Sequence, residues 1–184
     1  MTIIRFLRCN REDFLLYVGA PLAAFLLGLL VNAAAVFLFQ AESTFVFLPV
    51  LLAVLCALFA LTAGANAVLQ AFPMAVSFSV TRRSALLGVV SYTLLAALVL
   101  ALLSLLAAWA DRALVYQLFP LLRPGLEVLG DPLYELGPLA ILSAALGGAL
   151  AGFVGGAAIQ RFGRKAGWVL WGIYMAVFLL RDLL

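Results

Sequence analysis

The residues best suited to specific chemistry lie between residues 70 and 84, where an apolar segment is followed by the arginine pair Arg82 and Arg83. Pro73 disfavours a helical conformation at Phe72 and is well suited to the first turn of a new helix, so we expect a short helix to begin here. A short apolar helix beside a cationic pair, placed where the chain leaves a membrane, could serve as a handle for a partner protein.

The chain offers few groups for catalysis. It contains no histidine, and every Asp and Glu is expected in a loop or at a helix end. An intramembrane hydrolase needs a nucleophile with a base, and a proton-coupled carrier needs an ionisable group within the membrane. Cys9 and Cys56 provide no metal-ligand cluster, and no phosphate-binding loop is present. We therefore expect no enzyme activity, no metal site and no cofactor bound by this chain.

The composition indicates the class of protein. Of the 184 residues, 67% are hydrophobic and 10% are charged, whereas soluble domains are about 25% charged. These values indicate an all-α integral membrane protein. Because each span takes about 20 residues, the chain has room for five or six spans, and we expect a single transmembrane domain over residues 1–184.

Windows without charged residues locate the spans. They cover residues 14–41, 43–81, 84–110, 136–160 and 166–180. The second window is too long for one span, so we place its helix at about Phe45 to Leu69 and treat residues 70–84 as a separate interfacial segment containing the short helix. Five transmembrane helices are therefore expected, and a sixth is left open.

Two segments in the second half of the chain differ from an ordinary membrane span. The last window is about 22 Å long as a helix, against a hydrocarbon core of about 30 Å, so the last span is short. The segment between Ala113 and Glu135 is apolar at first and is then broken by prolines. We expect this segment to lie along or dip into the outer interface of the membrane, either as an amphipathic loop or as a lid over an exit pathway.

Positively charged residues gather on one side of the expected spans. They are Arg5, Arg8 and Arg11 before the first span, Arg82 and Arg83 after the second, and Arg161, Arg164 and Lys165 after the fourth. Because Lys and Arg are retained in the cytoplasm during insertion, we expect the N-terminus inside. The arginines at intervals of three before Asp13 further predict an amphipathic helix lying on the inner leaflet.

Polar residues inside the spans form one pattern. Thr62, Asn66 and Gln70 recur every four residues along the second span and therefore share one helix face, and Asn32 lies towards the outer part of the first span. Such residues either make hydrogen bonds between helices or line a pathway, and both interpretations stay open.

Glycines in the fourth span form a second pattern. Gly148, Gly152 and Gly156 recur every four residues and make a smooth face for close approach of another helix. That helix could belong to the same chain or to a second subunit.

Two motifs resemble a known family. Residues 72–83, Phe-Pro-Met-Ala-Val-Ser-Phe-Ser-Val-Thr-Arg-Arg, resemble the passage after span two of short ABC-2-type ABC transporter permeases found largely in Gram-positive bacteria, where the cytosolic coupling helix lies. Residues 161–168 are similar to the basic turn that enters the next span of those permeases. The family scheme has six spans with both termini inside, against the five that are legible here.

The resemblance implies the permease subunit of an ATP-driven exporter that moves an amphipathic peptide, lipid or drug. The coupling residues it implies are Phe72, Pro73, Met74, Val76, Phe78, Arg82 and Arg83. These would contact a separate ATPase subunit that holds ATP and Mg²⁺, and Thr81 or Ser84 would cap the helix that follows.

The resemblance also implies the setting of the protein. It implies a second permease subunit, in a homodimer or a heterodimer, membrane lipids as surroundings and no nucleic acid. The location implied is the bacterial cytoplasmic (plasma) membrane. The alternative function is a non-transport membrane scaffold or immunity protein that acts through helix–helix association.

Overall fold

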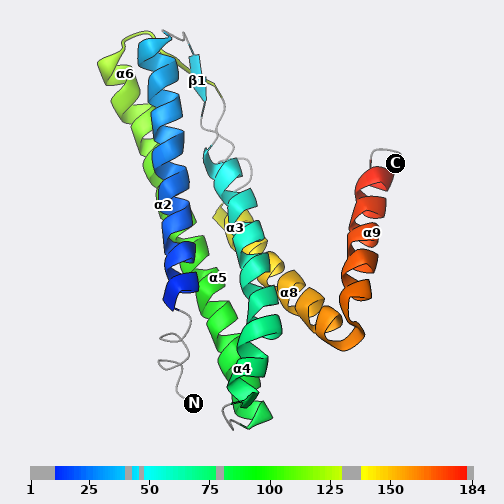
Figure 1. Cartoon of the computed structure of the whole chain (residues 1–184). Helices are drawn as coiled ribbons and strands as arrows, with labels where there is room; N and C mark the ends of the chain where they lie inside the picture. Colours follow the sequence, from blue (N-terminus) through cyan, green and yellow to red (C-terminus); the bar gives the residue numbers. More distant parts are fainter. Residues whose placement is uncertain (1–10, 40–42, 46–47, 78–80, 130–137, 182–184) are drawn as a thin grey trace.

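The computed structural model describes residues 11–39, 43–45, 48–77, 81–129 and 138–181, and it is an all-α membrane protein (Figure 1). Four helices are long and apolar enough to cross a membrane, namely Leu15–Leu38, Leu48–Ser77, Arg82–Leu122 and Pro138–Phe162. The helix α9, Arg164–Arg181, follows as a fifth long helix of 18 residues. The all-α membrane fold predicted from the sequence is therefore confirmed, and the predicted N-terminal amphipathic helix lies outside the described residues.

Most long helices are built from several consecutive elements. The elements are α2 (Arg11–Ala33), the π-helical turn η1 (Ala34–Leu38), β1 (Ser43–Phe45), α3 (Leu48–Asn66), η2 (Ala67–Ala71), α4 (Phe72–Ser77), α5 (Arg82–Ala113), η3 (Leu114–Leu118), α6 (Phe119–Leu122), β2 (Glu127–Leu129), α8 (Pro138–Phe162) and α9. The starts of α2 and α5, the end of α4 and the turn from α8 to α9 lie towards one end of the molecule, which we call the basic end (Figure 1). The opposite end, with β1, β2 and α6, is the strand end.

The second span does not stop before Pro73. α3, η2 and α4 form one helix of 30 residues from Leu48 to Ser77. The proline lacks the N–H that would bond to the carbonyl of Leu69, and the wider π-helical turn η2 ends at Ala71, two positions before it. The predicted break between Leu69 and Gln70 is therefore wrong, and α4 forms the last turns of the long helix.

The third span is also longer than predicted. α5, η3 and α6 form one helix of 41 residues from Arg82 to Leu122. At about 1.5 Å per residue this helix is about 60 Å long, twice the thickness of a hydrocarbon core. Residues 113–122 therefore extend the span beyond Asp111 rather than lying along the interface as predicted, because the apolar residues there pack against the end of α2.

A seam of direct backbone contact joins α8 to α3. A Cβ atom added to Gly152 would lie 2.7 Å from the carbonyl carbon of Leu61, and one added to Gly156 would lie 3.1 Å from the carbonyl oxygen of Ala65. One added to Gly148 would overlap the carbonyl oxygen of Ala57. No side chain fits between these backbones, so the glycine face of α8 is covered by α3 within the chain.

α9 leaves the bundle after a tight turn. Gly163 has a φ of 76°, a left-handed conformation that suits glycine, and its N–H donates to the carbonyl of Ile159 at 2.8 Å. The turn directs α9 away from α3 and α5, and its main packing partner is α8 (Figure 1). Trp168 and Trp171 on α9 are exposed, and their rings meet edge to face at 6.2 Å.

Replacing Gly152 with alanine is expected to destabilise the protein by about 1–3 kcal/mol, the usual cost of an extra methyl group in a packed interface. The added methyl would force α8 away from α3, because it meets backbone that cannot turn aside. Unfolding can be followed with a maleimide dye that reacts with Cys56, a buried free cysteine, in a Cys9→Ser background.

Gly147→Ala is the matched control for this measurement. Gly147 lies on the same helix, and a Cβ atom there would meet nothing within 4 Å. Alanine at this position should leave stability unchanged or raise it by up to about 1 kcal/mol through its better helix propensity. Equal losses of stability in the two variants would contradict the backbone seam.

Candidate functional site

The basic end carries a helical hairpin formed by α4 and the start of α5. Its inner face is lined by small buried residues that pack against each other, with Ala71 and Ala75 on one helix and Ala85 and Val89 on the other. Because these side chains are short, the two helices lie close together. The hairpin is therefore a compact unit that continues directly into two of the longest helices of the protein.

A side-chain cap fixes the start of α5. Thr81 has an extended backbone, with φ −60° and ψ 141°, and its Oγ1 accepts a hydrogen bond from the N–H of Ser84 at 3.4 Å. The N–H of Ala85 donates to the carbonyl oxygen of Thr81 at 2.9 Å. The predicted cap at the start of this helix is therefore confirmed, with Thr81 as the capping residue.

The predicted coupling residues divide into two groups by exposure. Met74 is 55% exposed, and Pro73 is exposed beside it. Arg82 and Arg83 are exposed at the start of α5. Phe72 and Val76 instead pack against the buried alanines of the hairpin, and Phe78 lies outside the described residues. Among the coupling residues that the structure describes, the exposed group is therefore the one placed to contact a partner.

The polar residues of the second span, which are predicted to share one face, lie open to the surroundings of the bundle. Thr62 and Gln70 are exposed and Asn66 is half-buried. The hydroxyl of Thr62 donates to the carbonyl of Phe59 in its own helix at 2.8 Å. These residues therefore lie on the outside of the described bundle and do not line an interior passage of this chain.

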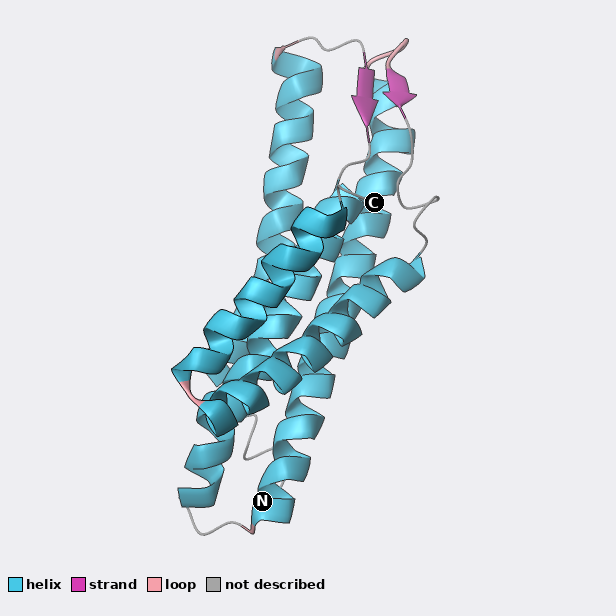
Figure 2. Ribbon diagram, turned by 90° about the vertical axis from the view of Figure 1, so that its right-hand side faces the viewer, coloured by secondary structure: helices cyan, strands magenta, loops and turns pink. Residues whose placement is uncertain are grey.

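Asn32 is not part of that polar face. It is 6% exposed at the strand end, and its Oδ1 accepts a hydrogen bond from the hydroxyl of the buried residue Thr44 at 2.6 Å. This bond holds β1 to the end of the first helix. β1 pairs in parallel with β2, with Thr44 opposite Val128, and Figure 2 shows the two strands side by side at the upper end of the helices.

A small core joins the elements of the strand end. Val36 and Val115, from the π-helical turns η1 and η3, are fully buried and pack with Phe119 and Leu126. The guanidinium of Arg123 donates a hydrogen bond to the carbonyl of Val36 and so adds a polar contact to this core. The first and third long helices are therefore held together at the strand end.

Asp111 is a functional candidate that sequence reasoning missed. It was expected in a loop, but it lies inside the long third helix and is 1% exposed. Its Oδ2 atom and the Nδ2 atom of Asn32 have no hydrogen-bond partner in the described part of the chain. The signal was its spacing, because Ser104, Ala107 and Asp111 fall three or four residues apart on the buried face of α5.

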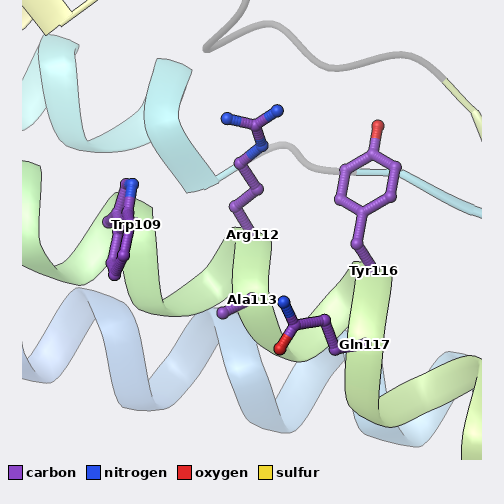
Figure 3. Close-up of a pocket in the computed structure, with 5 residues that line it drawn as sticks. All are labelled: Trp109, Arg112, Ala113, Tyr116 and Gln117. Atoms are coloured by element: carbon purple, nitrogen blue, oxygen red, sulfur yellow. The ribbon is translucent and has the colours of Figure 1, made fainter.

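A pocket of about 390 Å³ opens on the other face of the same helix. It is lined by Trp109, Arg112, Ala113, Tyr116 and Gln117, which are drawn in Figure 3. The guanidinium of Arg112 lies 5.9 Å from the centre of the Tyr116 ring, in cation–π contact. The sequence does not predict this pocket, because residues 113–117 are expected in an interfacial segment and not in a continuous helix.

The described residues contain no group of three or more Cys, Asp or Glu side chains that could hold a metal ion. Three groups of exposed residues are candidate recognition surfaces. These are the exposed cations and apolar residues of the hairpin, the open polar face of α3 and the aromatic pocket beside Arg112.

Thr44→Val is expected to lower stability by about 1–3 kcal/mol, because the buried Oδ1 of Asn32 loses its donor. Thr44→Ser keeps a hydroxyl and should remain close to the unmodified protein. The maleimide reaction of Cys56 on heating measures both. If valine and serine reduced stability equally, the hydroxyl would not be what holds β1 in place.

Comparisons with known proteins add no further assignment. No family model matches the chain, and no curated protein or solved structure matches it.

Proposed function

We propose that this chain is the transmembrane permease subunit of an ATP-driven exporter and that the α4–α5 hairpin couples it to a separate ATPase subunit. The observation that carries the proposal is the exposed set at the tip of the hairpin, Pro73 and Met74 on one helix and Arg82 and Arg83 on the next. The resemblance of residues 72–83 to the coupling segment of ABC-2-type permeases supports the same role. ATP and Mg²⁺ would bind to the partner.

The chemistry of the tip suits a protein partner. Methionine is flexible and polarizable and fills irregular apolar grooves. The arginines can pair with carboxylates through two parallel hydrogen bonds, which fixes the orientation of a docked surface. An apolar contact beside two charge-assisted contacts would give affinity and would also fix the position of the hairpin on the surface of the partner.

The hairpin is mechanically connected to the far end of the protein. From Arg82 the helix continues without a break to Leu122. A displacement of the tip therefore moves Val115 and Phe119, which pack against Val36 in the first span. Closure of an ATPase pair at the basic end would in this way shift the contact between the first and third long helices at the strand end. Such a movement is a rigid-body transition of packed helices.

A second permease subunit would pack beside α3. The exposed side chains of Thr62 and Gln70, with Asn66 between them, lie in the part of the helix nearer the basic end. Polar side chains facing lipid are unfavourable, so a protein surface or a water-filled passage between two subunits would cover them. The substrate, an amphipathic peptide, lipid or drug, would move along such a passage.

The proposed location is a bacterial cytoplasmic membrane with the basic end in the cytoplasm. Arg82, Arg83, Arg161 and Lys165 are exposed at or near that end. Retention of positive charge in the cytoplasm gives this orientation. The scaffold or immunity alternative has less support, because the glycine face of α8 that it would use is covered by α3.

The coupling role predicts that Met74→Ala, Arg82→Ala and Arg83→Ala together weaken ATPase binding about tenfold or more, since charged hydrogen bonds contribute about 1.5–3 kcal/mol each. The tagged chain is purified from membranes of its source cell. The measurements are the amount of ATPase subunit that co-purifies and its rate of ATP hydrolysis.

Arg161→Ala with Phe162→Ala is the matched control. These two residues are exposed, combine a cation with an apolar side chain and lie near the same end, at the close of α8. The control should retain the ATPase at the unmodified level. Retention in the hairpin variant as well, or the absence of any ATPase from the unmodified preparation, would refute the coupling role.

A further inference from the structure

The pocket beside Arg112 lies at a definite depth in the bilayer. Arg83 and Arg112 lie on one continuous helix, and at about 1.5 Å per residue they are about 43 Å apart along its axis. A bilayer including both headgroup layers is about 40–45 Å thick. With Arg83 at one headgroup layer, a helix close to the membrane normal therefore brings Arg112 to the other.

The side chains around the pocket are graded by depth. Trp109 is 69% exposed and lies one turn nearer the membrane centre than Arg112. Tyr116 and Gln117 lie one turn further out. Tryptophan and tyrosine favour the membrane interface because one part of the ring is apolar and the other can donate a hydrogen bond. Together they bracket the guanidinium, as Figure 3 shows.

An apolar stripe continues from the pocket towards the membrane centre. Leu98, Leu102 and Leu106 lie three or four residues apart below Trp109 and are exposed. The face therefore changes from leucine, through indole, to guanidinium and amide. This order matches a phospholipid, which has acyl chains, then an ester region and then a phosphate.

We propose that this pocket binds the phosphate of an anionic phospholipid in the leaflet at the strand end, with its acyl chains along the leucine stripe. Arg112 supplies the charge and a planar set of donors that suits a phosphate, and Gln117 adds an amide to the same pocket. The pocket is large enough for such a headgroup, because its volume of about 390 Å³ exceeds that of a phosphoglycerol group.

The chemistry favours an anionic headgroup over a zwitterionic one. A choline ammonium would need an aromatic face, but the face of Tyr116 already contacts the guanidinium of Arg112. A phosphatidylglycerol headgroup carries a single negative charge, opposite in sign to the charge of Arg112. The inference is independent of the proposed exporter function, because it needs only the pocket and a membrane.

Trp109 provides a local readout of the bound lipid. The chain has three tryptophans, so Trp168→Phe with Trp171→Phe leaves Trp109 as the only one. This protein is reconstituted in phosphatidylcholine vesicles that contain one-tenth phosphatidylglycerol, with bromine on the acyl chains of either lipid in turn. Bromine quenches indole fluorescence on contact, so quenching reports which lipid lies beside Trp109.

The expected result is that phosphatidylglycerol quenches Trp109 several times more than its share of the lipid predicts. In Arg112→Gln this excess should vanish, whereas Arg112→Lys should keep part of it. Arg161→Gln is the matched control, because it removes the same charge from an arginine that also lies over an aromatic ring, at 5.4 Å from Phe162. The control should keep the full excess.

Three results would overturn the proposal. Quenching in proportion to lipid content would show no selectivity, and an unchanged excess in Arg112→Gln would assign it to other groups. Loss of the excess on adding millimolar inorganic phosphate would show a site for free phosphate rather than for a lipid. The maleimide reaction of Cys56 checks that each variant is folded. If Arg112→Gln does not fold, Arg112→Lys tests the site in its place.

Discussion

Backbone contact between α3 and α8 is the interaction on which the rest of the arrangement depends. Within a membrane, lipid tails are as apolar as leucine, so helices associate through close packing rather than through the hydrophobic effect. The glycine seam of α8 brings its backbone against the carbonyls of Ala57 and Leu61, a distance at which weak Cα–H···O contacts also contribute. α8 in turn carries α9, whose main packing partner it is. Without this seam, α8 and α9 would lose their most extensive contact with the bundle.

Small residues give the middle of the bundle a different character from its ends. The buried residues of α3 and α5 near the membrane centre are largely alanine, which lets helices approach closely but gives them few specific contacts. The distinctive contacts lie at the ends, in the alanine-packed hairpin capped by Thr81 and in the strand-end core around Val36. Since the two longest helices run from the hairpin towards the other end, a displacement of the proposed coupling hairpin would pass through this alanine-rich middle to the strand end.

The sequence predicts the all-α membrane class and the cap at the start of α5, because the first follows from composition and the second from a local residue pattern. It misplaces the end of the second span because the rule for residues before proline is local, whereas the π-helical turn at Ala67–Ala71 relieves the strain at Pro73 within a continuous helix. Asp111 is misplaced because its charge suggests a loop, while its burial depends on contact with a different span. The pairing of β1 with β2 joins segments far apart in the chain, and strands of three residues carry no periodic signal.

α5 links the two proposed sites in one rigid element. Arg82 and Arg83 belong to the hairpin tip, and Arg112 to the pocket, on the same unbroken helix. A shift of this helix by one turn, about 5.4 Å, would carry the guanidinium of Arg112 out of the phosphate layer. A bound anionic lipid would therefore oppose motion of the hairpin along the helix axis, while a tilt about Arg112 would leave its contact intact. If both proposals hold, the lipid acts as a pivot, and the coupling motion is a tilt of α5 rather than a piston stroke.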